Sequence, residues 1–434
     1  MTRQPVTEAE DGATGKGPMR ALVLHPDLKS DRARRDPGPA LDEAVALAAA
    51  LPDLQVVGAE IVRLPRAQPG LLFGSGKIAE LKDRIAALAV GLVLIDGPVT
   101  PVQQRNLEKE WGVKLLDRTG LILEIFADRA ATREGVLQVE LAALSYQRTR
   151  LVRAWTHLER QRGGLGFVGG PGETQIEADR RAIDDAVLRI RRQLASVVKT
   201  RELHRKARKK VPYPIVALVG YTNAGKSTLF NRLTGAEVLA KDMLFATLDP
   251  TMRAVALPDG TEIILSDTVG FISDLPTQLV AAFRATLEEV LDADLICHVR
   301  DISHAETEEQ AADVAAILRG LGVPETAPMV EIWNKIDRLD PETAAAVGAM
   351  AGRREGVFAL SAVTGEGLEP LLAAIAERLS PPRHRSELRL THEDGRRRAW
   401  LYEQGVVDAE DADEDATLVR VNWTDRQEQA FRRL

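Results

Sequence analysis

Apolar runs and amphipathic stretches alternate along the N-terminal part of the chain. The strand-like runs cover residues 19–24, 55–63 and 90–95, and the helix-like stretches cover residues 41–51, 78–88 and 101–111. Strands and helices in this alternating order predict an α/β domain with a largely parallel sheet, which we assign to residues 19–133. The residues before it, 1–18, are polar and acidic with no apolar core, so we expect a disordered tail.

Two long helical stretches follow, with a glycine-rich segment between them. Residues 134–160 have a helical pattern, and residues 173–210 form a second stretch that becomes basic towards its end. The glycines of residues 163–172 disfavour regular structure, because glycine loses more backbone entropy on folding than any other residue. We therefore predict a helical linker over residues 134–211 that contains a flexible loop at residues 163–172.

The role of this linker stays open on pattern alone. The glycine-rich loop is either a simple connection or a segment that becomes ordered against a large partner. The basic end of the second helix is equally consistent with a solvated helix face and with docking on RNA phosphates.

Further apolar runs predict a central α/β domain over residues 212–380. These runs cover residues 214–219, 262–266, 294–299, 328–333 and 356–360. A proline pair after Leu379 ends the last helix of this domain. Beyond it we expect a small α+β domain over residues 387–434, with acidic residues 408–415 as an exposed loop.

In this last domain, strand-like runs cover residues 387–390 and 417–422, and helical stretches cover residues 396–404 and 425–433.

Composition narrows the class of protein. The 434 residues are 45% hydrophobic and 28% charged, which is ordinary for a globular chain of about three domains. No stretch is long enough for a transmembrane helix, so we expect no membrane insertion and a cytoplasmic protein, with peripheral attachment to a membrane left open. A formal net charge of −7 argues against general nucleic-acid affinity, so any RNA contact must be local. The single cysteine, Cys297, lies in an apolar run and is expected to be a buried structural thiol.

The central domain begins with a pattern that binds phosphate. Residues 220–227 read Gly-Tyr-Thr-Asn-Ala-Gly-Lys-Ser and follow a strand-like run. Between a strand and a helix, backbone N–H groups can converge on a triphosphate, and Gly220 and Gly225 permit the tight wrap because they lack a Cβ. Lys226 would reach the outer phosphates, and the Ser227 hydroxyl would ligate Mg²⁺. This context makes an ordinary glycine-rich turn a poor explanation.

A second pattern, Asp-Thr-Val-Gly, occupies residues 267–270 directly after a strand-like run. Asp267 would hold Mg²⁺ through water, and the Gly270 N–H would meet the γ-phosphate. Aspartate and glycine are common in turns, so the pattern is weak alone and strong only after a phosphate loop and a strand.

The residue that follows bears on the rate of hydrolysis. Many GTPases have a glutamine there that orients the attacking water, whereas this chain has Phe271 and Ile272. An apolar side chain accepts no hydrogen bond from water, so we expect slow intrinsic hydrolysis and a partner that completes the site. Phe271 as a mere packing residue is compatible with this expectation and does not supply the missing group.

A third pattern, Asn-Lys-Ile-Asp at residues 334–337, selects the base. The Asp337 carboxylate would accept from the ring N–H and the exocyclic amine of guanine, which adenine lacks at the matching edge. Asn334 would complete the pocket, and Lys335 would lie along the base. Residues 361–363 follow another strand and would offer backbone to the guanine oxygen. The alternative is a surface turn, which the context disfavours.

The loop between the first two patterns contains a candidate switch. GTPases need a threonine here that joins the Mg²⁺ site when the γ-phosphate is present. We favour Thr247 and keep Thr251 as the alternative, because spacing alone does not separate them. Either residue could also be an ordinary loop threonine that caps its own backbone.

Together these patterns predict a P-loop GTPase with a Rossmann-like mixed sheet that converts GTP into GDP and phosphate. The expected catalytic residues are Lys226, Thr247 and Gly270, and the expected Mg²⁺ ligands are Ser227, Thr247 and Asp267. The expected nucleotide contacts are Gly220, Tyr221, Thr222, Asn223, Ala224, Gly225, Lys226, Ser227, Thr228, Phe245, Ala246, Thr247, Leu248, Asp249, Asp267, Thr268, Val269, Gly270, Asn334, Lys335, Ile336, Asp337, Ser361, Ala362 and Val363.

Several of these motifs, with others, resemble those of the HflX family of translational GTPases. In the central domain they are residues 220–227, 245–249, 267–271 and 334–337, and outside it they are residues 73–77, 103–108, 116–123, 169–175 and 179–181. The resemblance covers roughly residues 20–380, and the last motif is the most specific. The C-terminal tail matches less clearly.

The resemblance implies a bacterial GTPase that binds the large ribosomal subunit, is stimulated by the ribosome, and splits stalled or idle ribosomes under stress. It also implies that the helical linker reaches towards the peptidyl-transferase region, and that the family threonine falls on Thr247. The glycine-rich loop then becomes the candidate for contact with ribosomal RNA, through Gly163, Gly164, Gly166, Phe167, Gly169, Gly170 and Gly172. Many members have a charged residue near the loop tip, whereas residues 166–170 here read Gly-Phe-Val-Gly-Gly, which leaves backbone contacts and Phe167 stacking on a base. We expect a monomer.

Two other functions stay open. The first is a slow GTP-dependent regulatory or assembly switch that acts on other RNA or protein partners. The second is catalysis on ATP by the N-terminal domain, where Gly-Ser-Gly-Lys at residues 74–77 resembles a fragment of a phosphate loop. The spacing of that fragment is wrong for a phosphate loop, so we interpret it as a strand-to-helix turn.

Overall fold

The computed structural model describes most of the chain, in two compact units that comprise residues Met1–Leu371 and Leu372–Leu434. The described residues are 18–29, 35–161, 171–208, 213–236, 244–245, 247–248, 251–273, 289–380, 383–391, 394–412, 416–432 and 434. Among the described helices, none combines the length and apolar character that crossing a bilayer requires.

The first sheet has four parallel strands in the order β2-β1-β3-β4. They are β1 (Met19–Leu28), β2 (Leu54–Leu64), β3 (Leu92–Ile95) and β4 (Lys114–Asp117). The connecting helices are α1 (Pro37–Ala49), α2 (Ser75–Ala87), α3 (Pro101–Trp111) and α4 (Arg118–Arg129). The predicted α/β domain with a parallel sheet is therefore confirmed.

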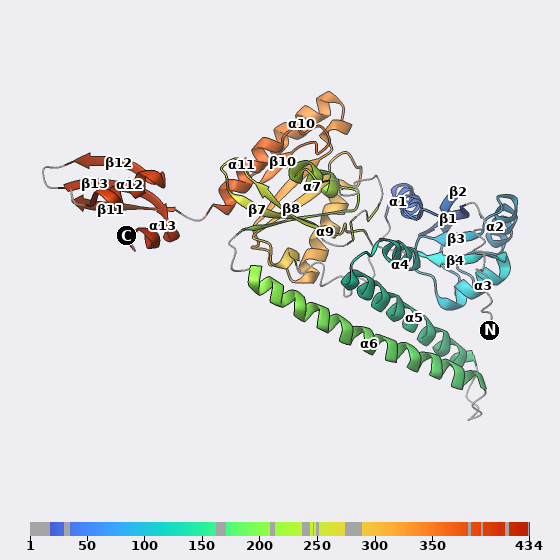
Figure 1. Cartoon of the computed structure of the whole chain (residues 1–434). Coiled ribbons are helices and arrows are strands. Elements are labelled where there is room, and N and C mark those ends of the chain that lie inside the picture. The colour runs from blue at the N-terminus through green and yellow to red at the C-terminus, as the bar shows by residue number, and fades with distance from the viewer. Residues whose placement is uncertain are drawn as a thin grey trace, which may run out of the picture. The chain divides into compact units, whose positions relative to one another are not determined.

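Alternation along the strands produces two apolar layers. In β1, Ala21 and Val23 belong to one core with α1 and α4, whereas Leu22 and Leu24 belong to a second core with α2 and α3. Successive side chains of a strand point to opposite faces, so each face is covered by its own helix pair (Figure 1).

Local signals explain where the helices begin. Helix α3 shows them most clearly: Thr100 and Gln103 form a reciprocal capping box, Pro101 occupies the first turn, and Gly112 closes the helix in the left-handed region at φ 71°. The apolar pattern missed β4 and α4, because this four-residue strand runs directly into the helix. Asp117 ends β4 and caps the start of α4, because its carboxylate accepts a hydrogen bond from the Gly120 N–H at 2.8 Å.

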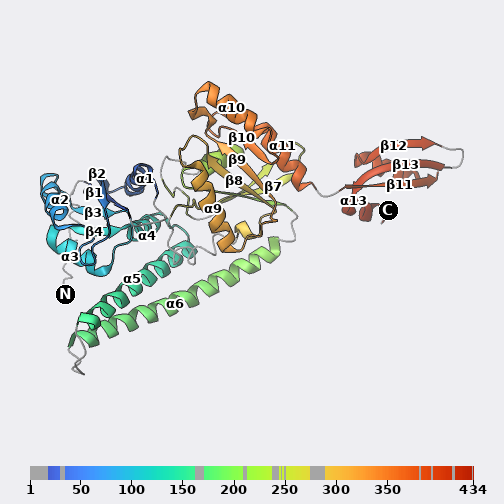
Figure 2. The ribbon, with the colours of Figure 1, turned by 180° about the vertical axis from the view of Figure 1, so that it is seen from behind.

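Two long helices follow, α5 (Arg133–Gln161) and α6 (Pro171–Arg208), and they lie side by side in both views (Figures 1 and 2). Buried apolar residues of α5 include Leu137 and Ala142, and those of α6 include Val187 and Ile190. The predicted loop was too long at its end: Pro171 and Gly172 belong to the first turn of α6, a position where proline is favoured.

The second sheet has six strands in the order β10-β9-β8-β5-β7-β6. They are β5 (Ile215–Gly220), β6 (Thr251–Ala256), β7 (Glu262–Asp267), β8 (Leu295–Asp301), β9 (Met329–Asn334) and β10 (Val357–Ala359). Only the edge strand β6, which was not predicted, pairs antiparallel within this sheet. The predicted mixed sheet is thus confirmed. Cys297 is fully buried in β8, as predicted.

Helices of this part are α7 (Lys226–Thr234), α9 (Thr307–Leu321), α10 (Pro341–Ala351) and α11 (Leu368–Leu379), with a short 3₁₀ helix η1 (Ile336–Arg338). Helix α9 packs its buried residues Val314 and Leu318 into the same core as Ala217, Val219 and Ile296 of the sheet.

Beyond α11, the C-terminal unit contains an antiparallel sheet in the order β11-β13-β12 and the described helices α12 and α13. Its elements are β11 (Arg383–Thr391), α12 (Gly395–Glu403), β12 (Val407–Ala412), β13 (Ala416–Thr424) and α13 (Asp425–Arg432). Val419, Val421 and Trp423 alternate along β13 and form the core of this unit with α12 and α13.

The prediction of an exposed acidic loop at residues 408–415 was wrong for its first part, which forms the edge strand β12. Glu410 binds Arg398 and Tyr402, and Asp411 binds Arg420 of the neighbouring strand, so the negative charges have partners within the sheet. As an edge strand, β12 forms its backbone hydrogen bonds with a single neighbour, β13. Residues 413–415 lie outside the described residues.

Candidate functional site

Loops from four parallel strands meet at one edge of the second sheet. The loop at residues 220–225 follows β5, residues 268–271 follow β7, residues 335–337 follow β9, and residues 361–363 follow β10. Carboxyl ends of parallel strands lie on the same edge, where ligands bind in open α/β folds. The three sequence motifs, far apart in the chain, are therefore brought together.

Glycines in the first loop allow close backbone packing. A Cβ on Gly220 would lie 2.1 Å from the carbonyl oxygen of Val299, and a Cβ on Gly225 would lie 2.2 Å from Nδ2 of Asn334. Gly225 also has φ 94°, in the left-handed region. Helix α7 begins at the next residue, so its free N–H groups face the loop, as in anion sites at helix N-termini.

The ammonium of Lys226 is buried beside this loop. Its Nζ donates to the carbonyl oxygens of Tyr221 at 2.8 Å and of Gly220 at 3.2 Å. Burial lowers the pKa of Lys226 to about 8. The charge of Asp267 opposes this shift, whereas the charge of Lys335 adds to it. A desolvated ammonium of this kind gains strongly from a neighbouring anion.

Three oxygen-bearing side chains converge beneath the loop. Asp267 is fully buried, and its Oδ2 accepts from Ser227 Oγ at 2.7 Å and from Thr247 Oγ1 at 2.8 Å. The two hydroxyl oxygens lie 2.9 Å apart. Burial raises the pKa of Asp267, although Lys226 and the two hydroxyls oppose the shift. Thr251, the alternative switch threonine, is instead the first residue of β6.

This donor set fits a magnesium ion. Among the described residues, Oδ1 of Asp267 is buried without a hydrogen-bond partner, next to the two hydroxyls. Mg²⁺ prefers oxygen ligands and is typically held by one or two carboxylates together with substrate phosphates and water. The carboxylate and hydroxyls therefore suit Mg²⁺ coordination together with a nucleotide.

Asn334 ties the phosphate loop to the loop that would meet the base. It is 2% exposed, and its Nδ2 donates to the Ala224 carbonyl at 2.8 Å, while its Oδ1 accepts from the Ala362 N–H at 2.9 Å. The side chain thus fixes both walls of the pocket, which is more than the sequence pattern assigned to it. Asp337 lies exposed in η1, where a ligand can reach it.

Lys335 has a partner that the motif did not predict. Its Nζ forms an ion pair with Asp301 Oδ2 at 2.8 Å, and its backbone adopts φ 67°. Asp301 is the last residue of β8, the strand beside β5. Its position at the carboxyl end of a predicted strand could have indicated that it belongs to the site.

The segment after Asp267 lies against the phosphate loop. The Thr222 N–H donates to the Phe271 carbonyl at 2.7 Å, and the Phe271 N–H donates to the Gly220 carbonyl at 3.1 Å. The ring of Phe271 is 1% exposed and lies in the apolar core, so it offers no polar group to a water at the nucleotide.

Several expected contacts turn out to have buried side chains that face the protein. Phe245 and Leu248 lie in the apolar core, and the Tyr221 hydroxyl is close to Glu43 and Ser273. Their backbones still belong to the loops around the site.

Some expected residues cannot be placed. Ala246 and Asp249 of the nucleotide set lie outside the described residues, as do Gly163, Gly164, Gly166, Phe167, Gly169 and Gly170 of the linker loop.

The turn at residues 74–77 shows no sign of a second phosphate loop. Gly74 is the N-cap of α2, and the Lys77 ammonium forms ion pairs with Glu60 and Glu80. A lysine held by two carboxylates on the surface of the first sheet suits a structural role.

Comparison with known proteins assigns most of the chain to family models. Residues 39–127 match the family model described as GTP-binding GTPase N-terminal, 129–208 the GTP-binding GTPase Middle Region, 215–335 the 50S ribosome-binding GTPase, and 346–434 the HflX C-terminal domain. The chain is 50% identical to GTPase HflX of Magnetococcus marinus over 94% of this chain and 93% of that protein. The chain belongs to the HflX family. GTPase HflX of Escherichia coli is 46% identical over 81% of this chain and 82% of that protein.

This HflX-family member is a P-loop GTPase that hydrolyses GTP, as the sequence predicted. A solved structure, a GTP-binding protein from the archaeon Sulfolobus solfataricus in complex with GDP, is similar over 83% of this chain and 98% of that chain, at 24% identity and a TM-score of 0.45. The C-terminal match extends the resemblance beyond the region in which the motifs were clear.

Proposed function

We propose that this HflX-family GTPase binds the large ribosomal subunit in its GTP state and splits stalled or idle ribosomes under stress. The family model over residues 215–335 is described as a ribosome-binding GTPase, which supports the partner. The observation that carries the proposal within the site is the buried ring at Phe271, where a water-orienting polar group is absent. A large partner that supplies this group would link hydrolysis to binding.

The roles of the site residues follow from their positions. Backbone N–H groups of residues 221–228 would bind the α- and β-phosphates, with Lys226 beside the outer phosphates and the Gly270 N–H at the γ-phosphate. Asp337 would read guanine, with Asn334 and Lys335 as the walls of the pocket. Backbone of residues 361–363 would meet the guanine oxygen.

Ser227, Thr247 and Asp267 would hold Mg²⁺, the last through water. When bound, the ion would neutralise negative charge that develops on the transferred phosphoryl group. Thr247 contacts Asp267 in this arrangement, and we expect it to leave the site when the γ-phosphate is lost, as the switch segments of GTPases do.

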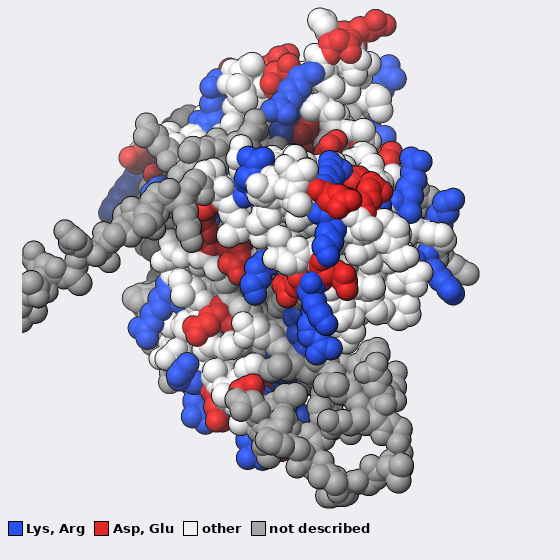
Figure 3. Space-filling view, turned by 90° about the vertical axis from the view of Figure 1, so that its right-hand side faces the viewer, with Lys and Arg blue, Asp and Glu red and all other residues white. Residues whose placement is uncertain are grey.

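Contact with ribosomal RNA would come from the α5–α6 linker and its glycine-rich loop. Acidic and basic side chains are interspersed on the face drawn in Figure 3, so overall charge does not select an RNA surface there. Helix α6 does expose Arg189, Arg191 and Arg192 within one turn, which suits phosphate contacts. We propose that the loop at residues 163–170 inserts among bases, with Phe167 stacking on one of them.

Sedimentation and light scattering test this proposal together. With a non-hydrolysable GTP analogue the chain should co-sediment with purified large subunits, and with GDP it should not. Addition of the chain and GTP to intact ribosomes should lower light scattering as the subunits separate. Phe167→Ala should slow the separation and Phe167→Tyr, which keeps the aromatic face, should preserve it. Co-sedimentation without any separation would favour the alternative of an assembly or regulatory switch, and no co-sedimentation would refute ribosome binding.

A further inference from the structure

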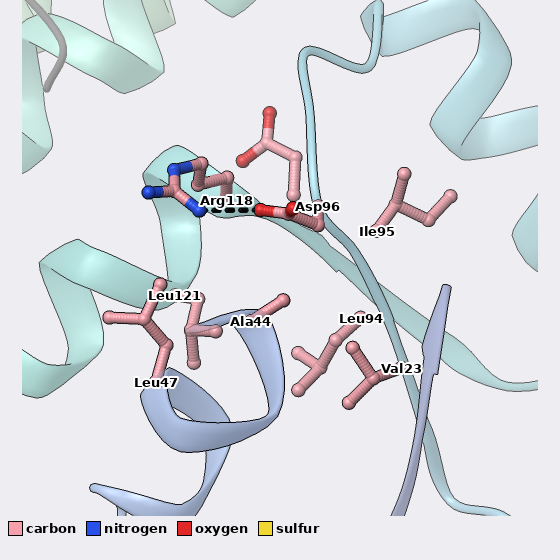
Figure 4. A pocket seen from close by; sticks show the side chains of 9 residues that line it. Val23, Ala44, Leu47, Leu94, Ile95, Asp96, Arg118 and Leu121 are labelled. Carbon is pink, nitrogen blue, oxygen red and sulfur yellow. Dashed lines mark hydrogen bonds and ion pairs between the residues drawn. The ribbon is translucent and has the colours of Figure 1, made fainter. Parts of the chain in front are cut away.

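Through Arg118, helix α4 contacts the segment that follows Gly270 of the GTPase site. Arg118 begins α4 at the carboxyl end of β4, and its side chain is only 7% exposed. Its guanidinium forms ion pairs with Asp96, at 2.6 Å, and with Glu43, and it donates to the Ser273 carbonyl at 2.9 Å. Figure 4 shows Arg118 and Asp96 facing each other beside a small cavity. Ser273 lies three residues after Gly270.

Ser273 also forms hydrogen bonds with the side chains of Tyr221 and Asp313. Its N–H donates to the Tyr221 hydroxyl at 2.8 Å, and its Oγ donates to Asp313 of α9 at 2.5 Å. The Tyr221 hydroxyl in turn donates to Glu43 of α1. One polar network therefore joins four parts of the chain. It links Tyr221 of the phosphate loop and Ser273, which follows Gly270, to helices α1 and α4 of the N-terminal domain.

A second contact from α4 meets the other switch segment. The ring of Phe126 packs edge-to-face on Phe245, with the centroids 4.6 Å apart and the planes at 79°. Phe245 lies two residues before Thr247, whose hydroxyl contacts Asp267. Helix α4 thus touches both segments that the γ-phosphate would order.

Burying an arginine is costly unless its charge is matched. Burial alone would lower the pKa of Arg118, but the charges of Asp96 and Glu43 outweigh it and raise the pKa above the ordinary value. The planar guanidinium addresses three acceptors at once, two carboxylates and one main-chain carbonyl, which a lysine ammonium cannot match in the same geometry.

We propose that α4 positions both switch segments for GTP hydrolysis, with Arg118 and Phe126 as its positioning residues. They stabilise Phe245, Thr247 and residues 270–273 in the arrangement that brings Thr247 and Gly270 to the nucleotide. GDP has no γ-phosphate for these segments to meet, so the contacts favour the triphosphate state selectively. A contact that only stabilised the fold would affect both nucleotides equally.

Nucleotide affinity and single-turnover hydrolysis of the full chain test this assignment without ribosomes, so the outcome is independent of the proposed ribosomal function. Arg118→Lys keeps the charge between Asp96 and Glu43 but loses the bond to the Ser273 carbonyl, and Phe126→Leu removes the ring contact. Each should weaken binding of a non-hydrolysable GTP analogue about tenfold, which is the range for one lost hydrogen bond to a charged group or one aromatic pair. Affinity for GDP should stay within about twofold, and single-turnover hydrolysis at saturating GTP should slow by a similar factor.

Arg129→Lys is the matched control, because Arg129 lies on the same helix and donates to the carbonyl of Ala50, the residue that follows α1. It should change neither affinity nor rate. Equal weakening of the analogue and GDP by Arg118→Lys would overturn the proposal, as would unchanged values for both. If Arg118→Lys fails to fold, Phe126→Leu decides by the same criterion.

Discussion

Replacing Gly270 by alanine should separate the GTP state of the site from its GDP state. A Cβ at this position would lie 2.8 Å from Cγ2 and 2.9 Å from Cα of Thr222, and 3.1 Å from Nζ of Lys226. Cα of Thr222 belongs to the phosphate loop, which is fixed through the bond from Asn334 to the Ala224 carbonyl. The segment that carries residue 270 must therefore move away.

The expected size of the effect follows from the bonds that this movement breaks. Two hydrogen bonds hold the segment to the phosphate loop, Thr222 N–H to the Phe271 carbonyl at 2.7 Å and Phe271 N–H to the Gly220 carbonyl at 3.1 Å. Each is worth about 0.5–1.5 kcal/mol net, so the closed arrangement loses about 1–3 kcal/mol. This corresponds to roughly a 5- to 150-fold loss of affinity for a triphosphate.

Fluorescence titration with labelled nucleotides measures the difference. Gly270→Ala should weaken binding of a non-hydrolysable GTP analogue by that factor and leave GDP binding within about twofold, because GDP does not need the closed segment. Gly320→Ala is the control, since this glycine lies in α9 with no atom within 4 Å of its added Cβ. An equal loss for both nucleotides would show that residue 270 supports the phosphate loop itself, and the reasoning about a separate γ-phosphate contact would fail.

Three further predictions concern charge. Asp337→Asn should lower GDP affinity by roughly 10- to 100-fold in calorimetry, because a carboxylate that accepts two guanine N–H groups is lost, and an unchanged Kd would contradict its role. Because burial lowers the pKa of Lys226 to about 8 and a bound phosphate would raise it, GDP affinity should begin to decline above about pH 7 and continue to fall through pH 9; an affinity that stays flat from pH 7 to 9 would refute this. Burial lowers the pKa of His298 to about 4 in the folded chain, whereas the pKa in the unfolded chain is about 6.5. Between these two values only the unfolded chain is protonated at His298, so the free energy of unfolding falls as the pH falls from about 6.5 towards 4. The stability advantage of the natural chain over His298→Gln in urea unfolding should therefore shrink by about 2–3 kcal/mol between pH 7 and 4.5, and an advantage that stays constant would contradict it.

Local patterns predicted most strands and helices, because their signals are local. Apolar runs with strand length between turn residues predicted most strands of both sheets, and the helical stretch predicted at residues 101–111 coincides with α3. The site motifs were also readable, since each follows a strand whose carboxyl end must lie at the shared edge. The structure brings Ser227, Thr247 and Asp267 within hydrogen-bonding distance, and their roles with nucleotide and metal stay predictions.

What sequence did not predict depends on contacts between distant residues. The acidic strand β12 reads as a loop because its stabilising partners, Arg398 and Arg420, belong to other elements. Tyr221 was expected among the nucleotide contacts, and the sequence did not indicate that its hydroxyl binds Glu43, which is 178 residues away in the chain. No local pattern encodes such a pairing, so the network around Arg118 became visible only in three dimensions.

The most direct test of the account is steady-state GTP hydrolysis with and without purified large ribosomal subunits. With Phe271 buried and apolar, turnover of the free chain should be slow, and saturating large subunits should raise it by at least about tenfold, while small subunits leave it unchanged. Rapid turnover by the free chain, or a rate that large subunits do not alter, would contradict the claim that the ribosome completes this site.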